Sequence, residues 1–155
     1  MGDLRCGTRP SEWFWNRKFS PVDLSQFLTF NTGANSVAAN TVLGVTALDA
    51  NTTGDRNTAI GKDALGANTT ANYNTAVGRT ALKTNTTGAF NTAIGRSALQ
   101  LNTAGHRNTA SGAYALDANT TADDNTALGY AALTANTTGA YNTAVGKDAL
   151  KVNTT

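Results

Sequence analysis

The sequence predicts an all-β fold, a β-solenoid of 17-residue coils preceded by an irregular or short-helical N-terminal arm. The pattern Asn-Thr-Ala-x-Gly, with x mostly aliphatic, recurs every 17 residues. That period is too short for paired-helix repeats of roughly 33 to 47 residues, but it suits one coil of a stack in which each copy contacts only its neighbours. With 27 Thr and 18 Asn but only 14% charged residues, polarity comes from uncharged side chains that such a stack can pair.

The repeat runs from Asn40 to Thr155, and its last copy is cut short. We expect residues 36–155 to form a seven-coil β-solenoid shaft and residues 1–35 to form an N-terminal docking arm. Seven positions are the same in every copy. In the second copy they are Asn57, Thr58, Gly61, Ala64, Leu65, Asn68 and Thr69.

Within one coil, Thr58 to Ile60 predict a short strand whose side chains alternate between two faces. We expect Thr58 and Ile60 to point inward, and Ala59 with its equivalents to form a smooth outer strip for a neighbouring chain. Gly61 should end the strand at a corner with positive φ or a close backbone approach. Leu65 should supply the second inward point. Alternatively, segments 78–85 and 95–102 each make one helical turn, because Ala, Leu, Lys and Gln favour helices.

The recurring Asn columns are expected to form hydrogen-bonded ladders between coils and to satisfy turn backbone. The residues predicted to hold the coils together are Asn57, Asn74, Asn91, Asn108, Asn125, Asn142, Gly61, Gly78, Gly95, Leu65, Leu82 and Leu99. One coil carries few large apolar side chains, so a single stack needs further cover. We therefore expect self-association about a rotation axis, three-fold or two-fold.

Positions that vary between copies are the candidates for function on the shaft. One column, before each Asn-Thr, is expected to form either a stabilising surface ladder or a glycan-contacting stripe; it contains Arg56, Tyr73, Phe90, Arg107, Asp124 and Tyr141. A second column is basic, and is expected to be either a solvated face or a polyanion site; it contains Lys62, Arg79, Arg96 and Lys147.

The N-terminal arm concentrates the large aromatic side chains, which together with Arg dominate binding hot spots. The residues predicted to dock onto a partner are Trp13, Phe14, Trp15, Arg17, Phe19, Phe27 and Phe30. The alternative is that they cap the open end of the solenoid. A Ser cap followed by Pro predicts a short helix over residues 21–29.

Composition excludes most chemistry. With one Cys, one His and one Met, the chain offers no disulfide and no metal site, and no catalytic group is recognisable, so we expect a non-enzymatic protein without cofactors. The net charge of +2 is too small to indicate a nucleic-acid partner. The start lacks the apolar core of a signal peptide and no run is long enough to span a membrane, so we expect synthesis in the cytoplasm and no membrane insertion.

The motifs NTAIG, NTAVG and NTALG resemble the S-V-A-I-G type motif in the left-handed β-roll heads of trimeric autotransporter adhesins. The whole unit resembles the GxxAL…NTTGxxNTAxG repeats of phage tail fibres still more closely, over residues 40–155. The resemblance implies a trimeric, left-handed, non-enzymatic roll. The chain departs from autotransporters because it shows no signal peptide, heptad stalk or membrane anchor, which favours a virion part.

The function expected from these features is structural: the trimeric shaft of a tail fibre or spike in a phage-like virion, assembled in the host cytoplasm. The arm would bind tail or capsid proteins, and the shaft would project toward the host surface and its glycans. The alternatives are a capsid decoration protein, a bacterial surface adhesin and an ice-binding solenoid. Ice binding is disfavoured here because Thr58 is expected to face inward.

Overall fold

The computed structural model describes residues 39–154. They contain no helix, so neither segment 78–85 nor segment 95–102 makes the alternative helical turn. The predicted docking arm, its aromatic residues and the predicted helix at 21–29 lie outside the described residues. Seven strands of three residues each are formed: β1 Thr41–Leu43, β2 Thr58–Ile60, β3 Thr75–Val77, β4 Thr92–Ile94, β5 Thr109–Ser111, β6 Thr126–Leu128 and β7 Thr143–Val145.

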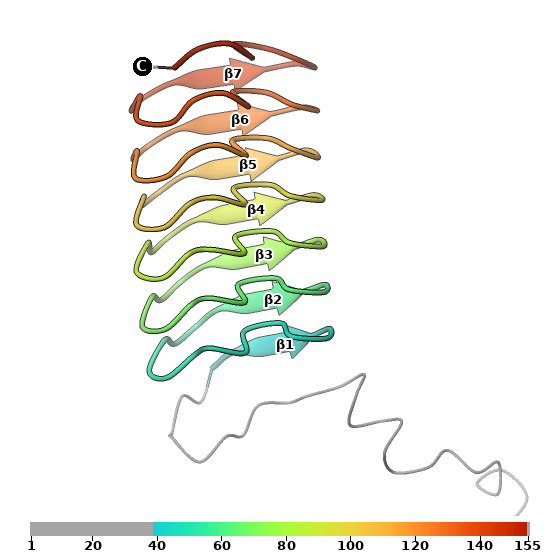
Figure 1. The fold of residues 1–155 in the computed structure, drawn as a ribbon, viewed down its shortest axis with the longest axis vertical. Coiled ribbons are helices and arrows are strands. Elements are labelled where there is room, and N and C mark those ends of the chain that lie inside the picture. The colour runs from blue at the N-terminus through green and yellow to red at the C-terminus, as the bar shows by residue number, and fades with distance from the viewer. Residues whose placement is uncertain (1–38, 155) are drawn as a thin grey trace, which may run out of the picture.

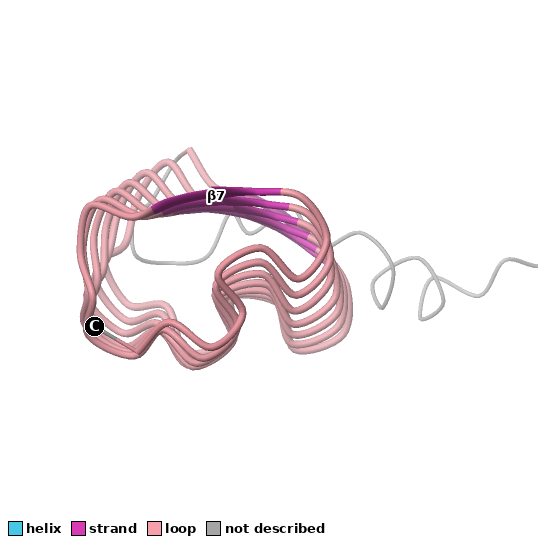
Figure 2. Ribbon diagram, turned by 90° about the horizontal axis from the view of Figure 1, so that it is seen from above, coloured by secondary structure: helices cyan, strands magenta, loops and turns pink. Residues whose placement is uncertain are grey.

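The strands form one parallel sheet in sequence order, with each residue paired to the residue 17 positions later. Between β3 and β4, for example, the Thr75 N–H donates to Asn91 O at 2.8 Å. In Figure 1 the strands run from left to right behind the return segments while the chain climbs from β1 to β7, so the coil is left-handed; Figure 2 shows the strands along one wall. The predicted β-solenoid is confirmed.

A left-handed coil is unusual, because parallel crossovers are usually right-handed. Each coil also holds several residues at positive φ, a region that L-residues disfavour. In the coil of β2 these are Gly61, Asp63, Leu65 and Tyr73, the last three at φ of 58°, 50° and 60°. Their conformation aims backbone N–H groups at adjacent coils. The Asp63 N–H donates to Val45 O at 3.0 Å and the Leu65 N–H to Ala81 O at 3.0 Å. Ladder hydrogen bonds therefore offset the local strain.

The two faces of the sheet are reversed relative to the sequence prediction. Ala59 is fully buried, whereas Thr58 and Ile60 are half-buried on the outside, and Ile94 in β4 is 45% exposed. The expected outer strip of Ala is therefore wrong. Figure 2 shows that the wall opposite the strands bends inward toward the sheet. Because Leu65 and Ala64 fill that narrow space, only a methyl group fits at Ala59.

The corner at Gly61 is confirmed on both counts. Its φ is +127°, and a Cβ added there would lie 2.7 Å from the carbonyl carbon of Gly78 in the next coil. The corner glycines thus permit both the left-handed turn and the close approach of successive coils.

Candidate functional site: ladders and outer columns of the stack

The first Asn column joins successive coils through backbone and side chain together. Asn74 is fully buried, and its Oδ1 accepts the Asn91 N–H at 2.9 Å. Its Nδ2 donates to Gly88 O, also at 2.9 Å. The same pair of bonds recurs at Asn57, Asn91, Asn108 and Asn125. The Asn side chains of this column therefore supply hydrogen-bond partners to buried backbone N–H and C=O groups.

The second Asn column forms a side-chain ladder. Asn102 Nδ2 donates to Asn85 Oδ1 at 2.8 Å, and Asn119 Nδ2 donates to Asn102 Oδ1 at 2.9 Å. Each Nδ2 also contacts the carbonyl three residues later, so Gly88 O accepts from both Asn74 and Asn85. Hydrogen bonds between buried amides thus contribute to the cohesion of the coils, which in a wider core comes mainly from apolar side chains.

The predicted surface ladder is divided into two parts. In the first part the Arg56 guanidinium carbon lies 5.1 Å from the ring centroid of Tyr73, and Tyr73 stacks on Phe90 with centroids 4.9 Å apart and ring planes 6° apart. All three side chains are exposed. Tyr73 thus contacts Arg56 in the coil before it and Phe90 in the coil after it, as expected for a stabilising ladder.

The second part of the ladder is ionic. Arg107 donates from Nε to Asp124 Oδ1 at 2.7 Å and from Nη2 to Asp124 Oδ2 at 3.0 Å. This pairing lowers the pKa of Asp124 and raises the pKa of Arg107, in both cases mainly through the hydrogen bond between them. Tyr141 continues the column at the end of the β6 coil and is exposed.

The outer sheet face consists of a Thr column and an aliphatic column that lie side by side along the whole stack. The Thr column is Thr41, Thr58, Thr75, Thr92, Thr109, Thr126 and Thr143, and the aliphatic column is Leu43, Ile60, Val77, Ile94, Leu128 and Val145, interrupted by Ser111. Parallel sheets are normally covered on both faces. Here the aliphatic side chains remain exposed or half-buried, so the face is a candidate interaction surface.

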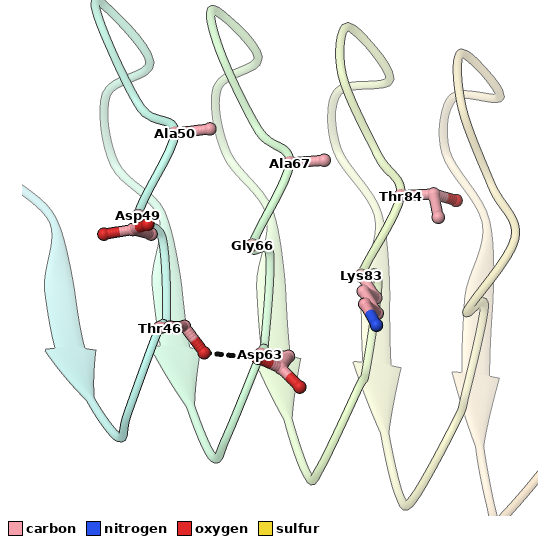
Figure 3. A pocket seen from close by; sticks show the side chains of 8 residues that line it. All are labelled: Thr46, Asp49, Ala50, Asp63, Gly66, Ala67, Lys83 and Thr84. Atoms are coloured by element: carbon pink, nitrogen blue, oxygen red, sulfur yellow. Dashed lines mark hydrogen bonds between the residues drawn. The ribbon is translucent and has the colours of Figure 1, made fainter.

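A hollow of about 380 Å³ opens where the second coil carries Gly66 between Asp49 and Lys83 of its neighbours (Figure 3). Thr46 donates its hydroxyl to Asp63 at the rim. Within residues 39–154 no three His, Cys, Asp or Glu side chains gather as a metal site would require. The hollow is lined by Asp49, Asp63 and Lys83 together with small residues.

Two aromatic residues of this surface were missed by the sequence interpretation. The Arg96 guanidinium carbon lies 5.4 Å from the ring centroid of Tyr114, and Tyr130 meets Tyr114 with ring centroids 5.9 Å apart and ring planes 80° apart. Tyr130 occupies the same repeat position as Lys62, so aligning all copies of the unit, rather than only the basic ones, would have found it.

Comparison with known proteins leaves the chain without an assigned relative: no family model, no curated protein and no solved structure matches it. In the part of the chain that the structure describes, no helix is long and apolar enough to cross a membrane.

Proposed function

We propose that the protein is the trimeric shaft of a tail fibre or spike on a phage-like particle, held by its aromatic N-terminal arm and projecting toward a host surface. The observation that carries the proposal is the exposed aliphatic column on the outer sheet face. The column has one position per coil. The same column of a second copy of the chain therefore has the same spacing and can pack against it coil by coil. The resemblance of the repeats to phage tail fibres favours three chains and a particle-borne role.

Self-association is tested by Ile94→Lys, which puts a charge in the middle of the outer sheet face. We expect the unmodified chain to scatter light as a trimer and the variant to dissociate, because a buried unpaired ammonium group is costly at an interface. Leu101→Lys is the matched control, because Leu101 is 44% exposed against 45% for Ile94 but lies outside the sheet. A monomeric unmodified chain, or equal behaviour of both variants, would refute this interface.

The docking role of the arm is tested by deleting residues 1–35. We expect the truncated chain to keep the circular-dichroism spectrum of the solenoid and to be lost from purified particles, because the arm rather than the shaft makes the attachment. If the truncated shaft is incorporated at the normal level, the arm is not the anchor. Comparing tail and head fractions separates a fibre from a capsid decoration protein.

Ice binding gains one observation from the structure. The Thr column lies on the outer face rather than inside, so the reason for disfavouring this alternative no longer holds. The Thr side chains form a regular array, about 4.8 Å apart along the stack. To bind ice this array must be open to solvent, whereas trimerisation through the sheet face would cover it. A monomer that shows thermal hysteresis would replace the shaft proposal.

A further inference from the structure

Three cations follow the corner glycine in three consecutive coils: Lys62, Arg79 and Arg96, called here the basic column. The coils that carry them are hydrogen-bonded to one another at these positions: Lys62 O accepts from the Thr80 N–H at 2.9 Å, and Arg79 O accepts from the Ser97 N–H at 3.0 Å. All three residues are exposed. The basic column therefore presents one positive charge per coil, about 4.8 Å apart.

Within residues 39–154 no carboxylate forms an ion pair with the basic column. The ion pairs among residues 39–154 engage Arg56, Arg107 and Lys151 instead. The nearby carboxylate of Asp63 accepts a hydrogen bond from Thr46, which is the main cause of its lowered pKa, and the surrounding cations lower it further. The charge of the column is thus available to a ligand from solution.

Aromatic side chains extend the basic column toward the C-terminal coils. The Arg96 guanidinium carbon lies 5.4 Å from the ring centroid of Tyr114, which also meets Tyr130 edge to face. Tyr130 is 50% exposed and occupies the column position two coils beyond Arg96. An exposed Tyr ring offers an apolar face with a polar tip, which suits the apolar face of a sugar ring.

We propose that the basic column and Tyr130 bind a linear acidic polysaccharide with a carboxylate on each sugar ring, lying along the stack. One pyranose ring advances such a polymer by about the height of one coil, and the long Lys and Arg side chains reach carboxylates on either edge. Duplex DNA, with one charge per about 1.7 Å of axis, fits a column of three cations poorly. The acidic polysaccharide would be part of the host surface toward which the shaft projects. To that extent the inference rests on the function proposed above.

Binding is measured by titration calorimetry of the full chain with a short oligogalacturonate at about 0.15 M salt. Its methyl ester has the same backbone without charge and serves as the ligand control. We expect the combined variant Lys62→Gln, Arg79→Gln, Arg96→Gln to bind about tenfold more weakly, as three exposed charge contacts are lost. The control variant Arg56→Gln, Arg107→Gln, Lys151→Gln removes three cations that lie outside this column, has the same net charge of −1 (2 − 3), and should bind normally.

Full binding by a variant with Arg79→Lys and Arg96→Lys would support recognition by charge at these positions. The proposal is overturned if the unmodified chain binds the oligogalacturonate more weakly than about 1 mM, if the ester binds equally, or if both combined variants lose affinity alike. Tighter binding of single-stranded DNA with the same dependence on the basic column would identify a nucleic acid instead. Because the assay needs no particle, its failure leaves the arm deletion as a separate test of the shaft.

Discussion

Gly95→Ala is expected to destabilise the protein by roughly 3 to 5 kcal/mol, through backbone strain and steric overlap together. Gly95 has a φ of +131°, and an added Cβ would lie 2.6 Å from the carbonyl carbon of Gly112. The backbone of Gly95 and of Gly112 is held by ladder hydrogen bonds, so neither coil can move away without breaking them. Urea unfolding followed by circular dichroism measures the loss.

Two other glycines separate strain from overlap. Gly146 has a φ of +122° but nothing within 4 Å of an added Cβ, so Gly146→Ala should cost only about 1 to 3 kcal/mol. Gly66 has no positive φ and its nearest contacts are an ordinary 3.4 Å away, so Gly66→Ala should change stability by less than about 1 kcal/mol. Equal effects at all three positions would contradict the proposed close approach of coils.

Asn91→Leu is expected to cost roughly 2 to 4 kcal/mol, the second largest effect, because it leaves the buried Asn108 N–H without an acceptor and removes a donor to Gly105 O. The break lies in a central coil, so contacts with neighbours on both sides are weakened. Thermal unfolding of the variant and the unmodified chain under one set of conditions measures the difference.

Asn72→Leu provides the matched control for the buried ladder. Asn72 Oδ1 also accepts a backbone N–H of an adjacent coil, that of Asp55 at 2.6 Å, but the residue is half-buried. Water can replace the lost acceptor there, so the cost should stay below about 1.5 kcal/mol. If both Leu variants lose the same stability, burial of the Asn91 column does not carry the effect.

The repeat predicted the coil, but not which face of the strand lies inside it. A period of 17 with recurrent Gly and Asn requires equivalent environments in successive copies, which a stack supplies. Alternation separates Ala59 from Thr58 and Ile60 without saying which side is inner, and the usual rule that larger aliphatics are buried gave the wrong answer. The decisive quantity is the width of the coil, which depends on the return wall containing Leu65.

The positive-φ residues were equally hidden from sequence reasoning. Leu and Tyr carry no local signal for the left-handed region, yet Leu65 and Tyr73 adopt it because their N–H groups bond to neighbouring coils. The surface columns were easier to anticipate, since positions 17 apart must lie side by side. The division of the ladder after Phe90 depends on individual side chains and had no counterpart in the repeat.

The central claim is that uncharged amides in two buried columns bind the coils to one another, and hydrogen exchange of the Asn side chains tests it most directly. Ten Asn side chains of these columns are buried. We expect their Nδ2 protons to exchange far more slowly than that of exposed Asn, and to become labile only with unfolding of the stack. Exchange of these protons at the rate of a free amide, in a chain that otherwise stays folded, would contradict the account.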